Sequence, residues 1–141
     1  MAKIRANYKN YKNAFRKHVY TYDNIQIGSE ISKKLLLCYC VECGLKCLIM
    51  QNNKITMISQ ANEELQKVLY SHDFKILLKA VRKAGIYKFQ KFQTEYGDSV
   101  TSENYHQMCR YCIESKDMEM DNINTFDSNL QEIASWLKEV I

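Results

Sequence analysis

The chain contains no proline and only four glycines in 141 residues. Proline and glycine are the residues that most often interrupt helices and shape tight β-turns, so their scarcity favours long helices. The 46% apolar and 26% charged residues are typical of a globular protein, neither disordered nor membranous, and a chain of this length can form one hydrophobic core. We therefore expect an all-α fold: a single domain over residues 1–141, built as a four- to five-helix up-and-down bundle.

Apolar residues recur at intervals of three and four along several segments, which places them on one face of a helix. The longest predicted helices run from about Arg5 to Tyr22, from Ser29 to Met50, and through the apolar stripe between Phe126 and Val140. Shorter helices are expected over 61–70, over 104–113, and between a cap at Ser71 and a stop at Gly85. Residues 97–102 are expected to form a loop, and 54–60 either a loop or a short extended piece.

The helix predicted over 29–50 is the most apolar part of the chain. Its apolar run, Leu35 to Met50, is interrupted by Glu42 and Lys46 and falls short of the ~20 residues that a membrane span needs, so it predicts the central buried helix of the bundle. Met1 to Arg16 is basic and lacks the apolar segment of a secretory signal peptide. These features predict a cytoplasmic protein with no membrane association, in which the six cysteines stay reduced.

Three segments of the chain resemble the HEPN family, the higher-eukaryote and prokaryote nucleotide-binding helical bundles. The stretch LLCYCVECGLK over 36–46 is similar to the "AxYAxExxLKAL" helix of these domains. Ser71-His72-Asp73-Phe74 before Leu77-Leu78 resembles their "GHDLxxLL" step, and Arg110-Tyr111 resembles their "RY" step. The order and spacing fit over about residue 11 to the C-terminus.

The resemblance implies a four- or five-helix bundle, often dimeric, of the kind found in ribonuclease toxins, antiphage defence proteins and non-catalytic RNA- or nucleotide-binding partners. In the nuclease members an arginine is followed a few residues later by a histidine, and the two line a cleft. This chain departs from that pattern, because His106 precedes Arg110 and His18 follows Arg16 too closely. The reversed spacing still places His106 and Arg110 on one helix face, so the candidate catalytic residues are His72, His106 and Arg110.

Glu42 and Lys46 are four residues apart on the most apolar helix, in the favourable order for an ion pair. A charge inside a bundle needs a partner, because an unpaired one costs several kcal/mol. We interpret the pair as structural, with Arg110 as a second partner for Glu42, and expect Glu42→Ala to lower the melting temperature sharply.

Two C-x-x-C pairs, Cys40 with Cys43 and Cys109 with Cys112, could on paper supply four thiolates for zinc. The first pair lies within an apolar helix, where free cysteine behaves as a small hydrophobe, so no metal and no cofactor is expected. Cys109, three residues from His106, is the only loose candidate for a thiol nucleophile.

Six positive charges without an intervening acid follow the predicted Ser71 cap, interleaved with Tyr87, Phe89 and Phe92. Cations of this kind can follow nucleic-acid phosphates, and rings can stack on bases. The other interpretation is a solvated helix face whose aromatic residues belong to the core. The nucleic-acid-binding candidates are Lys75, Lys79, Arg82, Lys83, Lys88 and Lys91.

These observations lead to the expectation of a HEPN-like domain, without clear catalytic machinery of its own, that binds RNA, a nucleotide or a partner protein in a bacterial defence or toxin–antitoxin setting. One alternative is a divergent metal-independent ribonuclease, and another is a structural assembly subunit. The segment 1–22 is basic and 114–141 is acidic. Opposite charge favours their meeting in a homodimer or with a partner protein encoded nearby.

Overall fold

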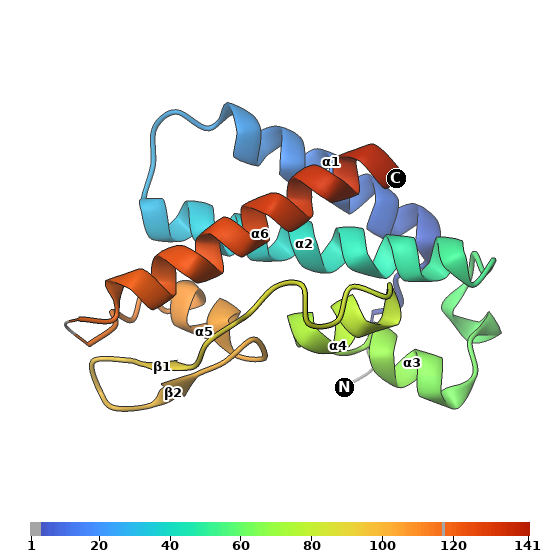
Figure 1. The fold of residues 1–141 in the computed structure, drawn as a ribbon. Coiled ribbons are helices and arrows are strands. Elements are labelled where there is room, and N and C mark those ends of the chain that lie inside the picture. Colours follow the sequence, from blue (N-terminus) through green and yellow to red (C-terminus); the bar gives the residue numbers. More distant parts are fainter. Residues whose placement is uncertain (1–3, 117) are drawn as a thin grey trace.

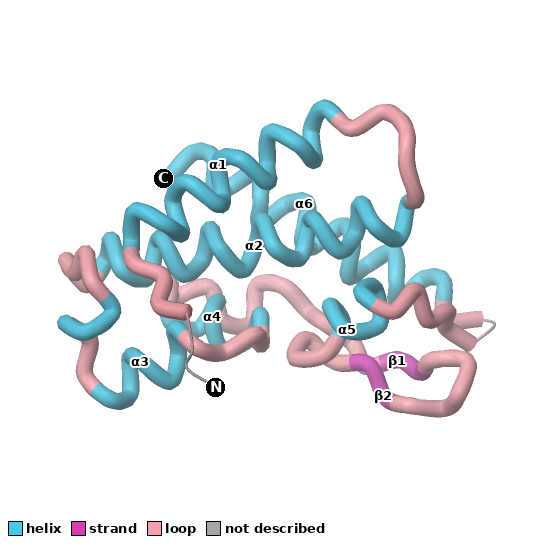
Figure 2. Tube along the Cα trace, turned by 180° about the vertical axis from the view of Figure 1, so that it is seen from behind, coloured by secondary structure: helices cyan, strands magenta, loops and turns pink. Residues whose placement is uncertain are grey.

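The computed structural model describes residues 4–116 and 118–141; residues 1–3 and 117 of the predicted domain lie outside the described part. Three long helices, α1 (Tyr8–Asn24), α2 (Glu30–Asn52) and α6 (Met120–Val140), dominate it, and α1 and α6 both pack on α2 (Figure 1). The short helices α3 (Glu63–Leu69), α4 (Phe74–Ala80) and α5 (Tyr105–Arg110) lie along the other side of α2, with α3 and α5 toward opposite ends (Figures 1 and 2). The prediction of a mainly helical protein is confirmed.

Helix α2 is the centre of the fold, because it contacts α1, α4, α5 and α6. Its residues from Gly44 to Met50 are all buried. At Gly44, an added Cβ would lie 2.7 Å from both Phe15 and Leu137, so this glycine lets α1 and α6 approach the helix closely. By length and mean hydropathy (1.3) α2 could cross a membrane, yet 61% of its apolar window is buried inside the protein. A buried core helix can have the same length and hydropathy, so these two properties do not by themselves indicate a membrane span.

Several element boundaries differ from the prediction. Helix α4 is capped by Asp73, whose carboxylate accepts a hydrogen bond from the Lys75 amide at 2.9 Å; the predicted cap, Ser71, accepts one from the Asp73 amide at 3.0 Å instead. The helix ends at Ala80 rather than near Gly85, because Arg82 adopts a positive φ of 63°. These corrections place His72 in the turn that leads into α4 rather than inside the helix.

The segment between α4 and α5 contains a short β-hairpin that the sequence did not predict. Strand β1 (Phe92–Gln93) pairs antiparallel with β2 (Ser99–Val100), in the region where only a loop was expected over 97–102. The 54–60 segment is a loop followed by the 3-10 turn η1 (Ile58–Gln60). Of the two predicted forms, a loop or a short extended piece, the structure has the loop. The hairpin buries Phe92 and Val100 and leads the chain back to α5, beside α2.

Candidate functional site

The structure brings Glu42, Lys46, His72, His106 and Arg110 to one side of α2, and we call this set the histidine cluster. Lys46 Nζ donates to Glu42 Oε2 at 3.1 Å, and His72 Nδ1 lies 3.0 Å from the other carboxylate oxygen, Oε1. The His72 and His106 rings are tilted, with centroids 5.4 Å apart. A carboxylate on α2 therefore joins an ammonium from its own helix to a histidine from the α4 turn, and α5 supplies the second histidine.

The two histidines differ in exposure. The His72 side chain is 58% exposed, whereas His106 is 7% exposed and its Nδ1 has no hydrogen-bond partner among the described residues. Burial, followed by the nearby His72 and Arg110, lowers the pKa of His106. His106 is therefore held neutral, and His72 is the member of the pair that solvent and ligands reach.

Arg110 lies one helical turn beyond His106 but does not form the expected ion pair with Glu42. Hydrogen bonds to Tyr111 and, with a smaller effect, to Tyr39 raise the pKa of the Arg110 guanidinium. His72, and not Arg110, is the second partner of the Glu42 carboxylate. The correction has a simple reason: Arg110 is exposed, and its long side chain reaches the tyrosines at the surface. Its charge still acts on His106.

Tyr11, a partly buried residue of α1, was not among the site residues predicted from the sequence. Its ring centroid lies 5.8 Å from Lys46 Nζ, and burial, with smaller contributions from Cys43 and Glu42, raises the pKa of Tyr11 to about 12. The spacing of Tyr11 along α1 showed a buried face but gave no sign of which charge that face would cover.

A second feature is a hollow of about 400 Å³ lined by Lys75, Lys79, Lys83 and Lys88, together with Leu78, Ala84, Gly85 and Tyr87. We call it the lysine hollow. Four of the six predicted nucleic-acid-binding residues therefore share one concave surface, and none of the described residues that line it is acidic. Arg82 lies beside Asn52, Asn53 and Ala80 instead, and Lys91 is exposed outside the lining.

The aromatic residues interleaved with these lysines do not form a stacking surface. Phe89 and Phe92 are 3% and 2% exposed, and both pack against Phe126, with ring centroids at 5.0 and 5.5 Å. Tyr87 is half-buried at the edge of the lysine hollow. The core interpretation of these rings therefore holds for the two phenylalanines.

The two C-x-x-C pairs do not converge. The thiol of Cys109 contacts Cys38, and the hydrogen bond with Cys38 lowers the pKa of Cys109. Burial raises the pKa of Cys40 to about 12 and that of Cys43 to about 11. Within 4–116 and 118–141, no three His, Cys, Asp or Glu side chains are placed to hold a metal ion.

Comparisons with protein families, with curated proteins and with solved structures give no match to this chain. Any function must therefore be argued from the histidine cluster and the lysine hollow themselves.

Proposed function

We propose that this chain is a HEPN-like helical domain that binds the phosphate groups of RNA or of a nucleotide and has no catalytic activity of its own. The HEPN-like assignment is supported by where its three sequence motifs lie. The α2 motif contributes Glu42, the second motif contributes His72, and the third begins at Arg110. All three motifs thus contribute a residue to the histidine cluster.

The lysine hollow is the observation that carries the proposal. An ammonium group binds phosphate as a point charge, and several of them along one surface release the counterions of a polyanion. Lys75 and Lys79 lie on α4, and Lys83 and Lys88 follow in the next segment, so lysines from two segments line one concavity. The Lys83 ammonium lies 4.7 Å from the centroid of the Trp136 ring. Leu78 and Ala84 give this surface an apolar floor, on which a base or ribose can rest.

Fluorescence anisotropy with a labelled single-stranded RNA tests the proposal. With about 0.7 counterions released per phosphate contact, four lysines predict a salt slope near −3 and a roughly 50-fold loss of affinity between 50 and 200 mM salt. Lys79→Gln/Lys83→Gln should reduce that slope by about 1.4. The control Lys54→Gln/Lys67→Gln removes two exposed lysines outside the hollow. An affinity that does not change between 50 and 200 mM salt contradicts the proposal. So does an equal change of the salt slope in the two double variants.

The geometry of the histidine cluster supports a second candidate, a metal-independent ribonuclease. Glu42 holds His72 by Nδ1 at 3.0 Å, which leaves Nε2 as its free nitrogen. The neutral ring of His106 lies beside it, and Arg110 supplies a positive charge. In such an enzyme Arg110 would stabilise the phosphate during attack by the RNA 2′-hydroxyl, and His72 and His106 would transfer the protons.

Incubation of the purified protein with total tRNA, with and without EDTA, separates the two candidates. Cleavage that survives EDTA and is lost in His72→Ala, His106→Ala and Arg110→Ala establishes the ribonuclease. Intact tRNA, together with salt-dependent binding, supports the binding domain. Cleavage that persists in all three variants reports a contaminating nuclease, and melting curves of each variant verify that it is folded.

A further inference from the structure

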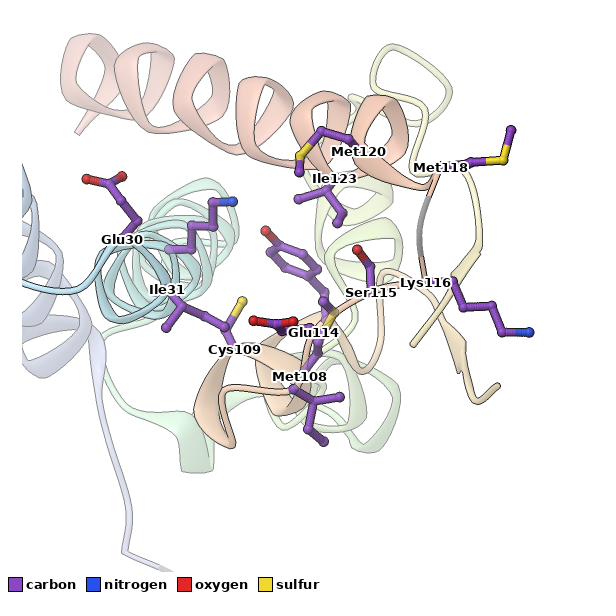
Figure 3. A pocket seen from close by; sticks show the side chains of 13 residues that line it. Glu30, Ile31, Met108, Cys109, Glu114, Ser115, Lys116, Met118, Met120 and Ile123 are labelled. Carbon is purple, nitrogen blue, oxygen red and sulfur yellow. The ribbon is translucent and has the colours of Figure 1, made fainter. Parts of the chain in front are cut away.

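A cavity of about 480 Å³ lies between the first turn of α2, helix α5 and the start of α6 (Figure 3). None of its lining residues belongs to the histidine cluster or to the lysine hollow. Helix α5 presents His106 and Arg110 to the cluster and Tyr105, Met108 and Cys109 to the cavity. The volume falls within the ~300–1,000 Å³ range of small-molecule sites.

The lining of this cavity is mainly apolar and balanced in charge. Isoleucines from α2, from the α5–α6 connection and from α6 form part of the wall, namely Ile31, Ile113 and Ile123. Met108 and Met120 also line it, and Met118 lies at its rim, where it is 98% exposed and its side chain points away from the cavity (Figure 3). Methionine is flexible and polarizable, so such a wall adapts to an apolar ligand. Among the described residues of the lining, two glutamates and two lysines cancel in charge, which favours an uncharged molecule.

Tyr105 provides one polar group in this wall. Tyr105 is 1% exposed, and its hydroxyl makes no hydrogen bond of good geometry among the described residues; the Cys109 thiol is the polar group close enough to act on it. The ring is held against Phe126, with centroids 4.7 Å apart. Burial raises the pKa of Tyr105, so the hydroxyl stays protonated and keeps a hydrogen to donate. A thiol sulfur is a weak acceptor and a poorly satisfied buried donor is costly, so a ligand oxygen reached by side-chain movement would be a better acceptor than Cys109.

We propose that this cavity is a binding site for a small, uncharged, mainly apolar molecule that carries one hydrogen-bond acceptor, which receives the hydrogen of the Tyr105 hydroxyl. The shape and apolar wall select the body of the molecule, and Tyr105 selects its acceptor. This site is independent of phosphate binding at the lysine hollow.

Two probes of the same bicyclic shape test the proposal, 1-indanone with a ketone oxygen and indane without one. Spectra of the protein labelled at the methionine methyl carbons should show shifts of the Met108 and Met120 signals with both probes, while the signals of Met50 and Met57, which do not line the cavity, should not shift. In Tyr105→Phe, 1-indanone loses one hydrogen bond and indane loses none. The dissociation constant of 1-indanone divided by that of indane should therefore rise about three- to tenfold. Taking a ratio cancels the different hydration of the two probes.

A second variant tests the cavity without touching Tyr105. Ile31→Trp fills it from the partly exposed face of α2 and should abolish binding of both probes, whereas Ile76→Trp, on the exposed face of α4, should not. If neither probe shifts the methionine signals at millimolar concentration, the proposed binding site is wrong. An unchanged ratio of dissociation constants in Tyr105→Phe overturns the role given to its hydroxyl.

Discussion

The ion pair in the core of the histidine cluster should be one of the most sensitive points of the fold. The Lys46 side chain is 5% exposed, and Glu42 Oε2, at 3.1 Å, is the carboxylate that neutralises it. Glu42→Ala leaves this ammonium buried, with the Tyr11 ring at 5.8 Å as its remaining electrostatic contact. A cation–π contact of that kind replaces only part of a carboxylate.

The size of the effect follows from the burial of the pair. Removing one partner of a buried ion pair costs ~3–5 kcal/mol. Because the Glu42 side chain keeps 19% exposure and water already reaches it, we take the lower end, about 3 kcal/mol. For a chain of this length that loss corresponds to a fall in melting temperature of roughly 10 °C.

Urea denaturation and thermal melting followed by circular dichroism measure this cost, and the chain supplies its own control. Glu63 and Lys67 have the same i, i+4 spacing, but their side chains are 88% and 76% exposed and 4.0 Å apart, so Glu63→Ala should change the stability by at most a few tenths of a kcal/mol.

A double-mutant cycle isolates the pair. In Glu42→Ala/Lys46→Met neither charge remains buried, so the double variant should be at least ~2 kcal/mol more stable than the sum of the single losses predicts. Losses of unfolding free energy that add up in the double variant would refute the assignment of Lys46 as a buried charge that depends on Glu42. A Glu42→Ala variant with the melting temperature of the wild type would refute it as well.

Three further changes have defined outcomes. Burial lowers the pKa of His106, so the unfolded chain takes up a proton below pH ~6.5 that the folded chain resists; melting temperature should fall from pH 7.5 to 5.5, and less so in His106→Gln. Gly44→Ala should destabilise by ~1–2 kcal/mol in urea, because its Cβ would meet the buried Phe15 ring at 2.7 Å and overpacking exceeds the gain in helix propensity. Iodoacetamide at pH 8 should alkylate the exposed Cys112 well before Cys40, whose pKa burial raises to about 12; peptide mass analysis reads the order.

Helix positions could be predicted from the sequence wherever the apolar period was long and local. The period of three and four located α1 and α2 to within a few residues, and Ser29 caps α2 as predicted. The start of α6 was missed by six residues, since Asp121, Asn122 and Asn124 are poor helix formers. Packing of Ile123 into the core overrides that local preference.

The candidate sites were predictable as residues but not as arrangements. His72 and Glu42 are thirty residues apart in sequence, so nothing local joins them, and the charge on Arg110 made it the more obvious partner for Glu42. The lysine run was visible because its members are neighbours in sequence. The methionine-lined cavity was not, because its wall is assembled from three separate elements (Figure 3) whose side chains have no pattern in common.

The burial of the two histidines bears directly on the choice between binding and cleavage. Proton transfer on both sides of a phosphodiester requires both rings to reach the reacting atoms. The His72 side chain is 58% exposed, but His106 is 7% exposed, so a phosphate can approach His72 and Arg110 but has little access to His106. The Nδ1 atom of His106, which has no hydrogen-bond partner among the described residues, is itself buried and is not accessible to a ligand at the surface. The cluster therefore lacks the second accessible ring that acid–base chemistry needs, which is why phosphate binding at the lysine hollow is the first proposal and cleavage the second.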